Sequence, residues 1–252
     1  MSRVKPSPDD AQPLPADGQF ATTQWSLVLR AGKRDDGQAE VALAELCQRY
    51  WFPLYAYVRR RSKDAHDAQD LTQEFFARLL EKQTLAEATP ERGRFRGFLL
   101  TSLKNFLANE WDRGHALKRG GGRTPLSFDW QAGESRMSFD VAHQLTAELL
   151  YERQWALTLL EHVISRLQDE FVAAGKSQQF ELLKGVLTGD RAGVSYAAIA
   201  SQLELSEAAA RKAAQRLRDR YRELLREEIA HTVANPADVQ DEIRRLFEIL
   251  AN

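Results

Sequence analysis

The polar residues between Arg211 and Arg216 have types and spacing that suit recognition of DNA. A serine that can cap a helix stands just before them, and the candidate contacts are Ser206, Arg211, Lys212, Gln215 and Arg216. Arginine and lysine pair with phosphates or with guanine, and glutamine pairs with adenine. Alanines and leucines of the same segment recur at helical period on the other side. The segment therefore predicts one helix with a basic face and an apolar face.

A shorter helix is predicted from Tyr196 to Leu203, capped by Ser195, with a turn at Glu204 and Leu205 before the basic helix. This order predicts a helix-turn-helix, in which the second helix lies in the major groove and its first residues contact base edges. Glu204 stands at the turn position that often holds glycine, where a positive φ costs a larger residue more. The alternative is a helical hairpin whose basic face is only solvated.

A second group of cations, amides and aromatics lies on the helix predicted from Phe95 to Arg119. The candidate contacts there are Arg96, Lys104, Asn105, Asn109, Trp111 and Arg113. Cations suit phosphates, amides suit base edges, and aromatic rings stack on the bases of a single strand. The alternative is that the aromatics of this helix belong to the core. This group predicts a second nucleic-acid contact.

Carboxylates gather on the helix predicted from Ala65 to Lys82. Its polar side carries Asp67, Asp70, Gln73, Glu74 and Arg78. Paired carboxylates at this spacing could hold a metal or serve acid–base catalysis, but no cysteine or histidine stands where it would complete such a site, and His66 is expected on the surface. The remaining histidines have no ligand spacing. We therefore predict no metal, no cofactor and no catalysis on this helix.

Composition narrows the class of protein further. The formal net charge of the 252 residues is −1, so any contact with nucleic acid must come from local patches. Cys47 is the only cysteine, which excludes an internal disulfide and fits a reducing cytosol. We expect no secretory signal and no membrane insertion, because no long apolar run occurs. The expected location is the cytoplasm, in association with the nucleoid.

The strand-like alternation of Val, Ile and Thr is nearly absent, so the expected fold is all-α, with two helical domains joined by a flexible linker. The expected divisions are a disordered tail at 1–21, a helical domain at 22–119, a linker at 120–138, a helix-turn-helix domain at 139–229 and an accessory helix at 230–252. The three glycines that open the linker lack the Gly-Lys-Ser/Thr ending of a phosphate loop. The accessory helix is expected to brace the second domain, and docking of a partner is the alternative.

Two parts of the chain resemble one family in the right order. QDLTQEFFARLLEK and FRGFLLTSLKNFLANEWDR resemble the second conserved region of bacterial sigma factors, and SYAAIASQLELSEAAARKAAQRLRDRYREL resembles their fourth region. Nothing between them resembles the third region. The combination resembles the extracytoplasmic-function (ECF) group of the sigma-70 family, over most of residues 39–119 and 151–225. The alanine-rich recognition helix, the terminal extensions and the long linker depart from the usual family pattern.

The resemblance implies an RNA polymerase sigma factor rather than an enzyme. Such a factor recruits core RNA polymerase to specific promoters and promotes DNA opening. The resemblance assigns the polar side of the 65–82 helix (Asp67, Asp70, Gln73, Glu74 and Arg78) to the β′ clamp helices of the polymerase. It assigns the 95–119 group to the −10 element, with capture of an extruded base, and the group from Ser206 to Arg216 to the −35 element. An anti-sigma factor as a further partner stays open. The alternatives are a stand-alone helix-turn-helix regulator and a helical interaction protein.

Overall fold

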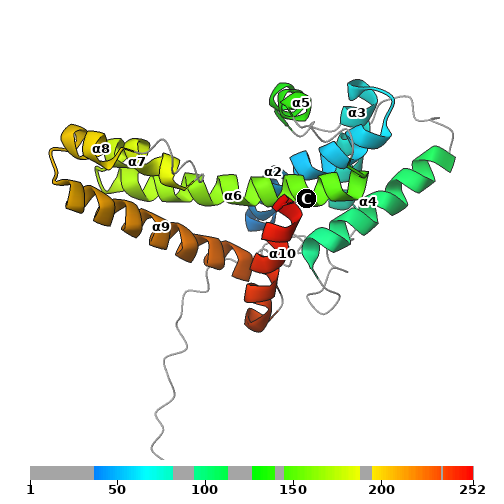
Figure 1. The fold of residues 1–252 in the computed structure, drawn as a ribbon. Coiled ribbons are helices and arrows are strands. Elements are labelled where there is room, and N and C mark those ends of the chain that lie inside the picture. The colour runs from blue at the N-terminus through cyan, green and yellow to red at the C-terminus, as the bar shows by residue number, and fades with distance from the viewer. Residues whose placement is uncertain are drawn as a thin grey trace, which may run out of the picture.

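The computed structural model describes residues 37–81, 94–112, 127–139, 145–187, 195–233 and 235–251. These segments are mostly helical and contain no strand (Figure 1), so the all-α prediction is confirmed. The expected tail at 1–21 and the first part of the expected linker, 120–126, lie outside the described residues. Arg113 lies outside them too, and of Trp111 only the backbone is described.

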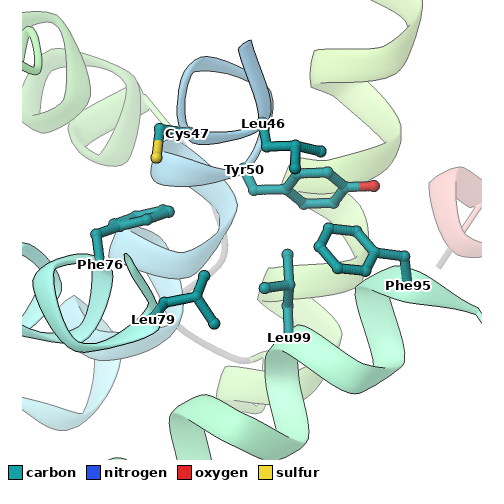
Figure 2. A pocket seen from close by; sticks show the side chains of 7 residues that line it. All are labelled: Leu46, Cys47, Tyr50, Phe76, Leu79, Phe95 and Leu99. Carbon is teal, nitrogen blue, oxygen red and sulfur yellow. The ribbon is translucent and has the colours of Figure 1, made fainter. Parts of the chain in front are cut away.

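The first three described helices pack together around a core of large side chains. They are α2 (Gly37–Arg61), α3 (Ala65–Glu81) and α4 (Phe95–Asp112). Figure 2 shows Tyr50, Phe76 and Leu99, one from each helix, directed toward the same space. Each of these side chains is at most 2% exposed. Pro53 lies inside α2, which continues through it to the three arginines of its last turn.

The second half of the expected linker is a helix rather than a flexible segment. Residues Trp130–Phe139 form α5, which packs on α2 through aromatic side chains. The Phe128 ring stacks on Trp51 with centroids 5.4 Å apart, and Trp130 meets the same ring edge-on at 5.6 Å. Burial of these aromatic rings outweighs the polar composition that predicted a linker. Gly133 permits this approach, because a Cβ there would lie 3.2 Å from Trp51.

A single long helix connects the two ends of the molecule. It is α6 (Ala147–Ala173), whose 27 residues span about 40 Å. It packs on α2 over one part of its length and on α9 (Glu207–Ala230) over another (Figure 1). Tyr151 and Leu167, near its two ends, are both fully buried. The described helices therefore share one core, where the sequence predicts two separate domains.

The remaining helices pack around α6 and α9. They are α7 (Ser177–Leu183), η4 (Lys184–Val186), α8 (Tyr196–Gln202), η5 (Pro236–Asp238) and α10 (Val239–Ala251). Figure 1 shows α7 and α8 at one end of α6, and α4 at the other. The last helix, α10, packs on both α6 and α9. This agrees with the expected brace, although α10 also reaches α4, as described below.

Candidate nucleic-acid interface

Helices α8 and α9 follow each other across a short turn, and both begin at the serines expected from the sequence. Both predicted caps are present: Ser195 Oγ accepts from the Ala198 N–H at 3.3 Å, and Ser206 Oγ accepts from the Ala209 N–H at 3.2 Å. Glu204 in the turn has φ = 54°, the left-handed conformation that favours glycine. The caps and this turn fix where α9 begins, and thus which of its residues lie at its exposed end.

Small side chains allow α8 and α9 to approach closely. Ala200 of α8 and the alanines at 210 and 214 of α9 are buried in the shared core. At the edge of this contact, the Tyr196 ring lies 5.0 Å from the Arg211 guanidinium, and its hydroxyl accepts from Arg218 at 3.2 Å. The two helices therefore form one packed unit with a polar outer face.

The first turns of α9 expose the predicted DNA contacts. Arg211 pairs with Glu207 at 2.5 Å, and the Gln215 amide donates to Asp219 at 2.9 Å. Lys212 and Arg216 are exposed and form no ion pair within the described residues. These two cations are therefore free to meet phosphates, whereas Arg211 and Gln215 must first leave an acidic neighbour.

On α4, the predicted amides are accessible. Asn105 and Asn109 are both exposed and stand four residues apart, so they share one face of the helix. Lys104 is 43% exposed and pairs with Glu148 of α6 at 2.8 Å. The structure therefore brings Lys104, Asn105 and Asn109 to the surface of one helix.

Arg96 does not fit its predicted role as a DNA contact. Its side chain is 3% exposed, lies 4.0 Å above the Trp155 ring and donates to Glu152 at 2.9 Å. It also pairs with Glu242 of α10. Burial lowers the pKa of the Arg96 guanidinium, but the two adjacent carboxylates outweigh it, so the pKa is raised and the side chain is charged. The prediction fails because α6 and α10 cover the start of α4.

The residue that the sequence analysis overlooked here is Glu242. It is fully buried, and one turn further along α10 the side chain of Leu246 is fully buried as well. An acidic residue in line with the apolar stripe of an amphipathic helix is a sequence signal for a buried ion pair. The sequence does not reveal that the partner lies 146 residues away, at Arg96.

The predicted acidic side of α3 is present as a surface. Asp70 is the most open of its residues: its carboxylate is 68% exposed and lies 3.8 Å from the exposed His66 ring. Asp67 and Gln73 are partly exposed. Glu74 is 42% exposed and accepts from Arg78 at 2.8 Å. Because residues at these spacings fall on one side of a helix, they form one polar surface.

Arg78 has a structural position rather than a free one. Its guanidinium binds Glu74 of α3 and, at 2.8 Å, Glu110 of α4, and it lies 4.9 Å from the centre of the Phe106 ring. Only 20% of the side chain is exposed. Arg78 therefore fixes α3 relative to α4, and its ion pair with Glu74 also orients one residue of the acidic surface.

Comparison with known families gives one match. Residues 46–116 match the model of Sigma-70 region 2. The match supports a sigma factor of the sigma-70 family. Region 2 domains of this family bind core RNA polymerase and promoter DNA, and sigma-70 family members are transcription factors rather than enzymes. Comparison with curated proteins returns no match, and comparison with solved structures returns none either.

The Sigma-70 region 2 match covers α3, α4 and α2 from Leu46 onward, and thus both the acidic surface of α3 and the exposed amides of α4. The helices from α5 to α10 lie outside it.

The apolar cavity in Figure 2 lies inside the matched helices and is lined by Cys47 among other side chains. Burial raises the pKa of the Cys47 thiol to about 12, so this thiol is unreactive at neutral pH.

Among the described residues, no cluster of His, Cys, Asp and Glu side chains could hold a metal ion. None of the described helices is both long and apolar enough to span a bilayer.

Proposed function

We propose that this chain is an ECF-type sigma factor, which recruits core RNA polymerase to specific promoters and promotes DNA opening there. The Sigma-70 region 2 match over residues 46–116 carries the proposal, because it covers the helices that expose the acidic surface and the amides. The α8–α9 pair lies at the far end of α6 (Figure 1). It adds Lys212 and Arg216, which are exposed and unpaired within the described residues. The proposed location is the cytoplasm, on the nucleoid, and an anti-sigma factor would be a further partner.

The acidic surface of α3 is the proposed polymerase contact. Asp67, Asp70, Gln73 and Glu74 would meet the β′ clamp helices, while Arg78 would hold α3 on α4. The support is the exposure of this surface: Asp70 is 68% and Glu74 is 42% exposed. Exposed carboxylates stay hydrated, so they cost little free energy. Their negative charge would complement a basic surface on a partner.

The exposed side of α4 is the proposed −10 contact. Lys104 would meet a phosphate, and Asn105 and Asn109 would meet base edges of the non-template strand. Trp111 and Arg113 complete this proposed set. Extruding a base costs a few kcal/mol, which stacking and edge hydrogen bonds can offset. The exposure of both asparagines supports this assignment.

The start of α9 is the proposed −35 contact, in the major groove of duplex DNA. Lys212 and Arg216 would bind phosphate or guanine, and Gln215 would bind adenine once it leaves Asp219. Ser206 and Arg211 complete the set at the first turn. The exposed, unpaired state of Lys212 and Arg216 within the described residues supports it.

The test is run-off transcription from genomic fragments with purified core polymerase and three chains: wild type, Asp70→Lys and Asp241→Lys. Asp241 of α10 is 67% exposed, so it is a matched control for a charge reversal on a surface helix. The proposal predicts new start sites with the wild type. Asp70→Lys should lower the amount of transcript at least about tenfold, and Asp241→Lys should leave it unchanged.

Sequence-specific binding to duplex DNA without any chain-dependent transcript or polymerase binding would favour the alternative, a stand-alone helix-turn-helix regulator. Equal transcription with Asp70→Lys and wild type would reject the assignment of α3 to the polymerase.

A further inference from the structure

The carboxylate of Glu242 on α10 is held by the two arginines at the start of α4. Its side chain is 0% exposed, and it pairs with Arg94 at 2.7 Å and with Arg96. Arg96 also binds Glu152 of α6, and the Arg96 carbonyl accepts from the Tyr151 hydroxyl at 2.9 Å. The last helix of the chain is thus attached to the first turn of the helix that we propose meets the −10 element.

The contact is specific, because a buried carboxylate is tolerated only when it is paired and hydrogen-bonded. Arg96 hydrogen-bonds one oxygen of Glu242, and Arg94 forms an ion pair with the other; both arginines lie outside α10. Leu246, also fully buried, supplies the apolar part of the contact. On the other side of α10, Asp241 and Arg244 are more than half exposed, as is Phe247, and among the residues that the structure describes these two pair only with each other.

We propose that α10 is an autoinhibitory clasp: Glu242 occupies Arg94, the arginine at which a phosphate of single-stranded DNA would bind, and Arg96 anchors the same carboxylate, so α10 must detach before a strand can lie along the whole of α4. This inference rests on the proposed function, in which α4 faces the promoter.

The chemistry of guanidinium groups supports the exchange of the Glu242 carboxylate for a phosphate. Their planar donor sets bind carboxylate and phosphate with the same forked geometry. Arg94 is 34% exposed, so its guanidinium borders the surface. Gly97, in the same first turn, is exposed, and a Cβ built on it would meet nothing within 4 Å. A strand following α4 toward Asn105 therefore has open surface beside the clasp.

The test measures binding of a short fluorescein-labelled single strand of mixed sequence to the full-length chain over a range of salt concentrations. Glu242→Gln weakens the clasp at its charge, and Leu246→Ser weakens it at its apolar contact. Asp241→Asn and Phe247→Ser are matched controls on the exposed side, and Asp241→Asn changes the net charge as Glu242→Gln does. Circular dichroism establishes that each variant keeps its helical content.

We expect Glu242→Gln and Leu246→Ser to bind the strand at least about tenfold more tightly than wild type, and the controls to bind like wild type. The slope of log affinity against log salt should steepen by about 0.7 for each phosphate gained. Adding Arg94→Gln to Glu242→Gln should abolish most of the gain. Folded Glu242→Gln and Leu246→Ser chains that bind no better than their controls would overturn the clasp.

A measurement on the wild type covers the case in which the variants do not fold. With saturating single strand, amide hydrogen exchange over residues 239–251 should accelerate, because α10 is released. Unchanged exchange in α10 with the strand bound would overturn the clasp. Run-off transcription separates the two proposals. Chain-dependent transcripts together with a failed clasp would leave the sigma factor function standing. No transcript with the wild type or the clasp variants, together with no strand binding by any of these chains, would reject both.

Discussion

The Glu228 carboxylate of α9 lies 3.4 Å from the Arg49 guanidinium of α2, across 179 residues of sequence. The Glu228 side chain is 4% exposed, and it also binds Arg166 of α6 at 2.5 Å and lies 3.6 Å from the His162 ring. One buried carboxylate thus joins the C-terminal part of α9 to α6 and to the region 2 helices.

Replacing Glu228 with Gln should lower the free energy of unfolding by about 3 kcal/mol near neutral pH, because two arginines lose a buried charged acceptor. Urea unfolding followed by circular dichroism measures this. Glu227→Gln is the control: Glu227 binds the same Arg166 at 3.1 Å but is 44% exposed, so its loss should cost less than about 0.5 kcal/mol. Equal losses for the two variants would show that burial does not matter here.

The same carboxylate should make stability depend on pH. Burial by itself raises the pKa of Glu228, but the hydrogen bonds from His162 and Arg166 and the charge of Arg49 outweigh it and lower the pKa from 4.5 to about 2. Since the folded-state pKa is depressed, the stabilisation is fully present above 4.5 and is lost as the pH falls toward about 2. The wild type should therefore lose more stability than Glu228→Gln across this window, and parallel curves would contradict the assignment.

Two glycines should respond oppositely to alanine. At Gly133 a Cβ would lie 3.2 Å from Trp51, whose ring is confined by Phe128 and Trp130, so Gly133→Ala should destabilise the fold by about 1 kcal/mol. At Gly97 the Cβ would meet nothing within 4 Å, and Gly97→Ala should stabilise α4 by up to about 1 kcal/mol. Thermal unfolding midpoints compare the two, and a rise for Gly133→Ala would mean that α5 can move away from α2.

The turn between α8 and α9 should be improved by glycine. Glu204 has φ = 54°, so Glu204→Gly relieves strain and should stabilise the fold by roughly 0.5 kcal/mol, after the loss of chain entropy. Ser201→Gly, on exposed helix three residues earlier, should destabilise it by roughly 0.5 kcal/mol. Thermal unfolding distinguishes the two, since the shifts have opposite signs; two downward shifts would argue against the strained turn.

If α9 binds duplex DNA, Lys212 and Arg216, two cations near its start that form no ion pair within the described residues, should carry the phosphate contacts. Lys212→Ala and Arg216→Ala should each weaken binding and reduce the salt slope by about 0.9, without loss of stability. Arg222→Ala is the control, because Arg222 is 59% exposed further along α9 and binds Asp219 at 2.7 Å. Fluorescence anisotropy with duplex DNA at several salt concentrations gives these slopes. An equal effect of Arg222→Ala would point to general charge rather than to the start of the helix.

The features that sequence alone predicted are local ones. Hydroxyl caps act within three residues, so Ser195 and Ser206 could be identified with the helices that they begin. The unfavourable backbone conformation of Glu204 follows from a sequence pattern that is equally short. The exposed amides of α4 and the acidic surface of α3 follow from helical period alone.

The features that sequence did not predict depend on distant partners. Arg96 looks like a surface cation until Glu242, 146 residues away, is placed beside it. Phe128 and Trp130 lie in a segment whose glycines and polar residues indicate a linker, and only the proximity of Trp51 makes them core residues. No period within a single helix carries that information.

The packing of α2 against α6 also constrains how the chain folds as it leaves the ribosome. The Tyr57 hydroxyl of α2 donates to Glu148 of α6 at 3.3 Å, and 91 residues separate them. At about 5–20 residues per second, the face of α2 that α6 covers waits roughly 5–20 s for its partner to be synthesised. During that interval the nascent chain exposes an apolar helix face, so α2 is the segment on which chaperone protection during translation matters most.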